Sequence, residues 1–353
     1  MNAGEIIILP SSVKEFPPRK ADFDWNYTDE ERDFIQNLVI YKDSAVIAVN
    51  KPPGLPVQGG SGVRKSLDKI AAACLSFDYL EPPRLVHRLD RDSSGILILG
   101  RTRTSAVVLH SIFREETCAA VNNSERKRSI RKTYWALVLG TPKSSSGTIN
   151  APLGKMGVDD ARSERMTTAK SDRTAAQHHA ITRYKVINAC EGRNLKNNKE
   201  SKHILPQEGC VVGRADMAGT DATYRQKTSG KKREANNCLW RDDDGARMQL
   251  RVHCAEMLGT PIVGDYKYGW KGHRERRFGG EKSKCGMSLP FGIDMESGSI
   301  SDERPRLHLH CKRMLLPDVA HARRGDCGFS LLRLEAPLPS YMQWSFDVLS
   351  KRS

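Results

Sequence analysis

The sequence lacks the features that mark several common classes of protein. Its nine cysteines are scattered and include no Cys-x-x-Cys pair, which is typical of reduced thiols in a reducing compartment rather than of a disulfide framework. No apolar run approaches the roughly 18 to 20 residues that a membrane-spanning helix needs. Internal repeats and heptad arrays are also missing. The chain is therefore expected to be a soluble globular protein.

Two local motifs are absent as well. The glycine-rich stretch at residues 59–66 fails the spacing of a nucleotide-binding phosphate loop, because Arg64 stands where that loop requires glycine. The first thirty residues carry several acidic side chains, so they differ from an Arg-rich, acid-poor transit peptide. Either there is no such peptide, or the sequence begins after its removal.

What the sequence has is a large basic surplus. Its 353 residues include 57 Lys and Arg against 42 Asp and Glu, which gives a formal net charge of +15. Such a surplus indicates a polyanionic partner, because each neutralised phosphate releases counterions. Nucleic acid is therefore favoured over a surface that is merely basic and solvated.

Residues 87–95 are the most informative stretch. They read His-Arg-Leu-Asp-Arg-Asp-Ser-Ser-Gly and lie between two apolar runs of strand length. The Asp-Ser-Ser-Gly end supplies turn residues, of which Gly95 is free to take a positive φ. Such a loop can hold the carboxylate of Asp90 at the lip of a sheet, partly shielded and next to a cation.

Two other segments carry candidate functional side chains. Residues 132–136, Lys-Thr-Tyr-Trp-Ala, belong to a strongly predicted strand. Residues 249–253, Gln-Leu-Arg-Val-His, precede the run Leu-Gly-Thr-Pro-Ile-Val-Gly-Asp-Tyr-Lys-Tyr-Gly at 258–269. Arg251 lies inside an apolar run, and an arginine in that setting needs a buried partner.

Together these segments resemble the RluA-type pseudouridine synthases. That family's His-Arg-Leu-Asp signature ends in Thr-Ser-Gly, and only Ser93 departs from it. Its Lys-x-Tyr-x-Ala and Leu-Gly-x-Pro-Ile-x-Gly-Asp motifs are also present. The runs at 54–60 and 307–310 look most like the mitochondrial branch, which acts on organellar RNA including ribosomal RNA. Residues 245–248, Gly-Ala-Arg-Met, replace the family's Gly-Arg-x-His and remove polar contacts near the site.

The resemblance implies an α+β fold, with a mixed, largely antiparallel sheet, flanking helices and a central RNA-binding cleft. It implies a catalytic domain at residues 39–340, preceded at 1–38 by an arm and a short helix without the S4 module of many relatives. A C-terminal tail is expected at 341–353. Polar insertions are predicted near 117–130, 192–237 and 270–306.

The implied reaction converts uridine in RNA to pseudouridine. The C1′–N1 bond breaks, the uracil turns and its C5 joins C1′, which requires no metal and no cofactor. Asp90 would serve as nucleophile or base, and Arg251 would keep it ionised. Tyr134 would stack on the uracil and help to remove the C5 proton.

A base inside folded RNA must first be flipped out of its stack. Arg88 is the candidate to occupy the vacated place, and Leu250 is the candidate apolar floor for the base. The neighbouring motif residues His87, Lys132 and Gln249 are expected to contact RNA as well.

The expected substrate is structured RNA, with ribosomal RNA favoured over transfer RNA, and proteins of ribosomal assembly intermediates are possible further partners. No membrane partner is expected. The expected location is the mitochondrial matrix, with the cytoplasm or nucleus as the alternative. An RNA-binding assembly factor with little or no catalysis is the alternative function. A hydrolase built on Asp90 and Asp92 is disfavoured, because two residues of one loop provide no independent second carboxylate wall.

Overall fold

A computed structural model describes residues 27–60, 63, 65–118, 130–156, 165–168, 174–190, 210–221, 244–269, 289–302, 304–320 and 330–350. Its helices are α1 (Asp29–Asn37), α2 (Leu67–Cys74), α3 (Arg103–Cys118), α4 (Asp244–Val252), the π-helical turn η1 (His253–Met257), the 3-10 helix η2 (Pro290–Gly292) and α6 (Ser340–Ser350). Its strands are β1 (Val39–Lys42), β2 (Val46–Lys51), β3 (Arg84–Leu85), β4 (Ser94–Gly100), β5 (Arg131–Leu139), β6 (Ser146–Asn150), β7 (Leu153–Met156), β8 (Arg165–Thr168), β9 (Thr174–Cys190), β10 (Cys210–Asp221), β11 (Leu309–Pro317) and β12 (Leu331–Glu335).

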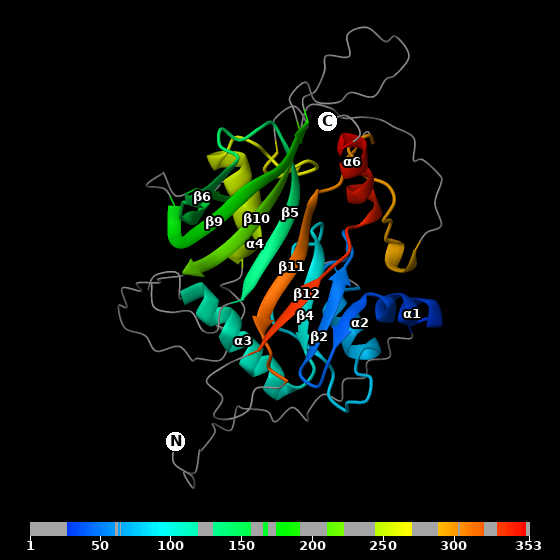
Figure 1. Cartoon of the computed structure of the whole chain (residues 1–353). Coiled ribbons are helices and arrows are strands. Elements are labelled where there is room, and N and C mark those ends of the chain that lie inside the picture. Colours follow the sequence, from blue (N-terminus) through cyan, green and yellow to red (C-terminus); the bar gives the residue numbers. More distant parts are fainter. Residues whose placement is uncertain are drawn as a thin grey trace, which may run out of the picture.

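The strands form one mixed sheet in the order β1-β2-β4-β11-β5-β10-β9-β7-β8, with β3, β6 and β12 paired at its sides. The only parallel pairing among the described strands joins β4 to β11, and it covers just Ser94 with His310 and Gly95 with Cys311. This short contact joins the half of the sheet that contains β1, β2 and β4 to the half that begins with β11 and β5, and Figure 1 shows these strands side by side. The predicted mixed, largely antiparallel sheet is therefore observed.

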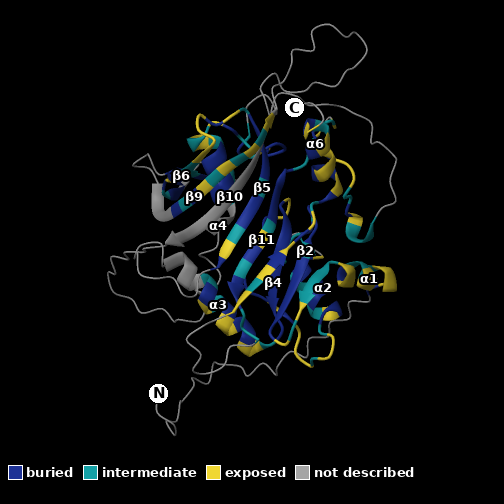
Figure 2. Cartoon of the chain, viewed as in Figure 1, coloured by how far each residue is buried: buried dark blue, intermediate teal, exposed yellow. Residues whose placement is uncertain are grey.

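The alternation of side chains along β5 explains how both faces of the sheet are covered. Tyr134 and Ala136 belong to the main hydrophobic core, together with Leu250 of α4. Leu137 and Leu139 point to the opposite face and pack with α6, as period-two side-chain direction requires. Figure 2 shows the central strands β2, β4, β11 and β5 as mostly buried.

The first described helix, α1, starts at a capping box. Thr28 is the N-cap of α1 and accepts a hydrogen bond from the Glu31 backbone, while the Glu31 side chain accepts one from the Thr28 backbone. This reciprocal pair satisfies two donors that a helix start leaves open. Ile35 and Tyr27 are buried in the main core, so this part of the predicted arm is integral to the fold.

Two predictions about segment boundaries are wrong. The predicted tail at 341–353 contains α6, whose buried Tyr341, Met342, Phe346 and Leu349 form one apolar stripe against the sheet. The predicted insertion at 192–237 contains β10, a strand between β5 and β9. The polar residues around β10 hid that strand, which gains its stability from β5 and β9, neighbours that are distant in sequence. The helix α6 carries an apolar stripe, but the surface that buries the stripe is formed by distant segments.

Only part of each of the other two predicted insertions lies among the described residues. Within 270–306, the described residues from 289 onward include η2 and the buried Ile293 and Ile300. Near 117–130, α3 runs to Cys118 and Ile130 is buried. The remainder of each lies outside the described residues. No helix in the described part of the chain has the length and hydropathy needed to cross a bilayer.

Candidate active site

The loop at residues 86–93 connects β3 to β4 and lies where the two halves of the sheet meet. Asp90 lies in this loop and is 7% exposed. On its outgoing side, Gly95 has φ +108°, and a Cβ there would lie 2.4 Å from the Cys311 carbonyl oxygen. Only glycine fits this approach, so the predicted glycine turn is confirmed.

His87 anchors the loop from inside the core. Its Nε2 accepts a hydrogen bond from the Ile98 backbone N–H at 2.9 Å, and its ring stacks on Phe113 with centroids 4.6 Å apart. Burial lowers the pKa of His87 well below its usual value, and the nearby Lys132 lowers it further. The predicted RNA contact of His87 is therefore wrong, because the ring is buried and already occupied by the fold.

Lys51 supports the loop from beneath. Its side chain is fully buried, and its Nζ donates to the carbonyl oxygens of Pro52, Arg91 and Ser93 at 2.8, 2.9 and 2.8 Å. Burial lowers the pKa of Lys51 to about 7. No role was predicted for Lys51, although it stands directly before the Pro-Pro-Gly break that ends its strand.

Arg251 joins Asp90 to a second carboxylate. Its Nη1 donates to Asp90 Oδ2 at 2.9 Å, while its Nε and Nη2 donate to the two oxygens of Asp265, both at 2.7 Å. The side chains of Arg251, Asp90 and Asp265 are only 11%, 6% and 1% exposed. The predicted pairing of Asp90 with Arg251 is confirmed, and the bidentate partner Asp265 was missed.

Asp265 is held by more than the arginine. Its Oδ1 also accepts the backbone N–H groups of Lys267 at 3.2 Å and Tyr268 at 2.9 Å. The Tyr268 ring lies 5.2 Å from the Arg251 guanidinium carbon. The signal for Asp265 was its place after Gly264, whose φ of +75° makes the turn that directs the carboxylate inward.

These contacts fix the charge of Arg251. Burial by itself lowers the pKa of Arg251, but the hydrogen bonds and charges of Asp265 and Asp90 outweigh burial, and the pKa is raised. The same Nη1 lies 3.4 Å from the Met248 sulfur. Met248 stands where the resembling family has histidine, so a weak sulfur acceptor remains where a polar ring was expected.

Tyr134 and Leu250 are both buried in the main hydrophobic core. Tyr134 is 7% exposed and lies opposite Cys311 in the register of β5 and β11. Leu250 is 2% exposed and directly precedes Arg251. The structure therefore places an aromatic side chain on a central strand and an aliphatic one next to the residue that pairs with Asp90.

The remaining predicted RNA contacts divide into two kinds. Gln249 is 1% exposed, and its Nε2 donates to Ile181 O at 2.8 Å and Thr182 Oγ1 at 3.0 Å. Its predicted RNA contact is therefore wrong, because the amide ties α4 to β9. Arg88 and Lys132 are half-buried. Arg88 Nη1 donates to Gln58 at 3.1 Å, and Lys132 Nζ lies 4.9 Å from the Phe113 ring.

Comparison with known proteins gives this geometry a context. The model of the RNA pseudouridylate synthase family matches residues 45–256. The chain is 42% identical over its whole length to RNA pseudouridine synthase 4, mitochondrial, of Arabidopsis thaliana, and covers 69% of that protein. The chain belongs to the RNA pseudouridine synthase family. The synthase is also 30% identical, over 67% of its own length and 58% of the relative's, to ribosomal large subunit pseudouridine synthase C of Rickettsia prowazekii.

Solved structures agree on the fold. The structure of human RNA pseudouridylate synthase domain containing 4 aligns with 90% of this chain and 95% of that one, with a TM-score of 0.52 at 21% identity. The predicted α+β pseudouridine synthase fold is thus confirmed. As a member of this family, the synthase isomerises uridine to pseudouridine in RNA. The mitochondrial names of several relatives support the predicted mitochondrial location.

Proposed function

We propose that Asp90 is the catalytic carboxylate of this synthase. The observation that carries the proposal is the chain of contacts from Asp90 through Arg251 to Asp265, which places one carboxylate beside a permanent cation at the junction of the sheet. The guanidinium of Arg251 balances the charge of a carboxylate whose side chain is only 6% exposed. A carboxylate in that state can act at C1′ of the flipped uridine as nucleophile or base.

Asp265 orients Arg251, and Arg251 orients Asp90. Asp265 holds the Nε and Nη2 edge of the guanidinium in a bidentate pair, which leaves Nη1 directed at Asp90. Because the guanidinium is planar and rigid, the two hydrogen bonds on its Nε and Nη2 edge also fix the direction of Nη1. Arg251 therefore places the reactive oxygen as well as balancing its charge.

Tyr134 and Leu250 are the proposed walls for the uracil. Both side chains are buried in the main core, and Leu250 directly precedes Arg251, which contacts Asp90; these observations support the assignment. Once the C1′–N1 bond breaks, the detached uracil has to turn and present C5 to C1′ without leaving. An aromatic face and an aliphatic face allow that rotation, because neither makes a directional hydrogen bond with the ring.

Structured RNA of the organelle, and ribosomal RNA in particular, is the proposed substrate. The net charge of +15 and the Rickettsia relative named for the large ribosomal subunit support it. Arg88 is proposed to fill the place of the flipped base, and Lys132 to contact the backbone. One catalytic domain is proposed that includes α1 and α6, since both pack into its cores.

The test is substitution of Asp90 by Asn. Turnover of a pseudouridine-forming RNA substrate should be lost, while the melting temperature and RNA affinity stay close to wild type, since shape is kept and only the ionised oxygen is changed. Asp78→Asn, the same substitution at an exposed position, is the matched control and should leave turnover unchanged. Substantial turnover by Asp90→Asn would refute the assignment.

The same variant separates an enzyme from an RNA-binding assembly factor. Cells depleted of the protein are complemented with wild type or Asp90→Asn, and pseudouridines and ribosome assembly are both measured. Failure of Asp90→Asn to restore function supports catalysis as the main role. Full rescue of assembly without pseudouridine would show that the protein acts mainly as a scaffold.

A further inference from the structure

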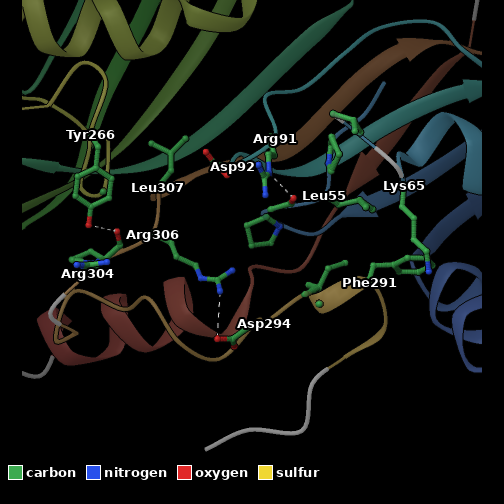
Figure 3. Close-up of a pocket in the computed structure, with 18 residues that line it drawn as sticks. Leu55, Lys65, Arg91, Asp92, Tyr266, Phe291, Asp294, Arg304, Arg306 and Leu307 are labelled. Carbon is green, nitrogen blue, oxygen red and sulfur yellow. Dashed lines mark hydrogen bonds and ion pairs between the residues drawn. The ribbon is translucent and has the colours of Figure 1, made fainter. Parts of the chain in front are cut away.

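A pocket of about 620 Å³ is lined in part by Arg91 and Asp92 of the loop that carries Asp90. Its walls come from residues 53–56 after β2, Arg91 and Asp92 of the loop, Gly264 and Tyr266, and two described parts of the third predicted insertion, 291–294 and 304–307. Figure 3 shows these segments facing one another around the opening. A volume of this size lies within the usual range of small-ligand sites, about 300 to 1,000 Å³.

The pocket shares a wall with the active site. Arg91 directly follows Asp90, and Gly264 and Tyr266 flank Asp265. Consecutive Cα atoms are about 3.8 Å apart, so the pocket wall includes the immediate chain neighbours of Asp90 and Asp265. Asp90, Tyr134 and Arg251 themselves do not line it. The pocket is therefore separate from the proposed site of the flipped base.

The lining is basic. Lys65, Arg91, Arg304 and Arg306 stand against two acids, Asp92 and Asp294. Arg91 is exposed, and its Nε donates to Gly54 O at 3.0 Å, which directs the side chain along the pocket wall. Within the described ranges, the Nη groups of Arg91 have no hydrogen-bond or ion-pair partner. These donors suit a phosphate group.

Aromatic rings lie at the two ends of the pocket. Tyr266 is 47% exposed, and its hydroxyl donates to Pro305 O at 3.0 Å, which fixes the ring near Arg304. Phe291, at the other end, has φ +65°, a backbone conformation that is uncommon outside glycine and collects at functional positions. An exposed, tethered ring beside cations is the combination that single-stranded nucleic acid binds, by stacking and by backbone charge.

We propose that this pocket binds a nucleotide that flanks the target uridine in the RNA. Its base stacks on Tyr266, and its phosphate lies between Arg91 and Arg304. The proposal rests on the proposed function, because the occupant is continuous with the RNA that enters the active site. It adds a contact that reads the unpaired strand next to the flipped base.

The test measures binding of a fluorescein-labelled heptauridylate by anisotropy at several salt concentrations. Tyr266→Leu should weaken binding by about fivefold or more through loss of stacking, whereas Tyr266→Phe, which keeps the ring, should bind like wild type. Arg304→Ala should lower the slope of log affinity against log salt by about 0.7, the value for one phosphate contact to a single strand. Arg333→Ala is the matched control, because Arg333 is an exposed arginine of β12 outside the pocket.

Equal affinities for wild type, Tyr266→Leu and Arg304→Ala would overturn the proposal. The proposal would also be overturned if UMP or inorganic phosphate bound the pocket as tightly as heptauridylate, because a small anion would then be the ligand. The melting temperature of each variant establishes that it folds. Pseudouridine formation is measured in parallel with Asp90→Asn as reference. If wild type makes pseudouridine but the pocket variants bind normally, only the pocket proposal fails. If the pocket variants bind weakly while wild type makes no pseudouridine, the pocket is shown to bind RNA, but the proposed function fails and with it the assignment of the bound nucleotide as the neighbour of a target uridine.

Discussion

Two arginine–aspartate pairs, Arg251 with Asp265 and Arg306 with Asp294, differ in burial. Arg251 holds Asp265 at 2.7 Å with side chains 11% and 1% exposed. Arg306 lies 3.4 Å from Asp294 with side chains 30% and 48% exposed. The first pair belongs to the active site, and the second borders the pocket.

The difference in burial determines what each ion pair can contribute. A buried pair is dehydrated, so removal of one partner leaves a charge without compensation, which costs about 3 to 5 kcal/mol. An exposed pair is solvated before and after, and contributes about 0 to 1 kcal/mol. The buried pair can therefore fix a geometry. The exposed pair can exchange its partner for an incoming phosphate.

The largest expected effect comes from breaking the buried pair. Arg251→Leu should lower the free energy of unfolding by about 3 to 5 kcal/mol, because Asp265 and Asp90 both lose their buried cation. Pseudouridine formation should be lost as well. Urea unfolding and turnover of an RNA substrate measure the two effects.

Arg251→Lys is the matched control, because it keeps the positive charge and removes the planar guanidinium. Lysine keeps the cation but cannot reproduce the fork that reaches both carboxylates. It should recover part of the stability and little of the turnover. An unchanged unfolding free energy for Arg251→Leu would contradict the buried geometry.

A second prediction concerns Lys51, the fully buried cation beneath the loop. Its pKa is lowered by burial to about 7 in the folded state, against about 10.4 for an ordinary lysine. Between these values the unfolded chain binds more protons than the folded one, so stability rises with pH, by up to about 1.4 kcal/mol per unit. Below pH 7 both states are protonated, and this dependence disappears.

The measurement is the unfolding free energy of wild type and Lys51→Met from pH 6 to pH 10. The difference between the two should shift in favour of wild type as the pH rises above about 7. Lys143→Met, a substitution of an exposed lysine, provides the baseline. A difference that stays constant across this range would show that Lys51 remains charged in the folded protein.

The smallest expected effect is on the exposed pair. Asp294→Asn keeps the Oδ1 that accepts the Glu296 and Ser297 backbone N–H groups but removes the charge that faces Arg306. Stability should change by less than about 1 kcal/mol, and salt should reduce the difference further. Urea unfolding at low and high salt measures it. A loss of unfolding free energy as large as that of Arg251→Leu would contradict the distinction between the buried and the exposed ion pair.

Much of the site was predictable because its signals are local. The loop around Asp90, the glycine turn at Gly95 and the strand that carries Tyr134 each follow from a few consecutive residues, since turn chemistry and period-two alternation depend on neighbours in the chain. An arginine in an apolar run needs a buried partner, and the resemblance to the family implied that the partner of Arg251 is Asp90. The expected roles of His87 and Gln249 failed, because a polar side chain in a motif can serve the fold as well as the substrate.

The family and the reaction could be inferred from the sequence alone, and so could the proposed catalytic carboxylate and its cation. The groups that surround them depend on the tertiary structure. Asp90 and Arg251 are 161 residues apart, and Lys51 reaches Ser93 across 42 residues, so neither the fork to Asp265 nor the buried lysine has a local signature. The same holds for α6 and β10, whose stability comes from strands and cores assembled from distant segments. Burial is a property of the folded chain, and burial separates the fixed arginine of the active site from the exposed arginines of the pocket.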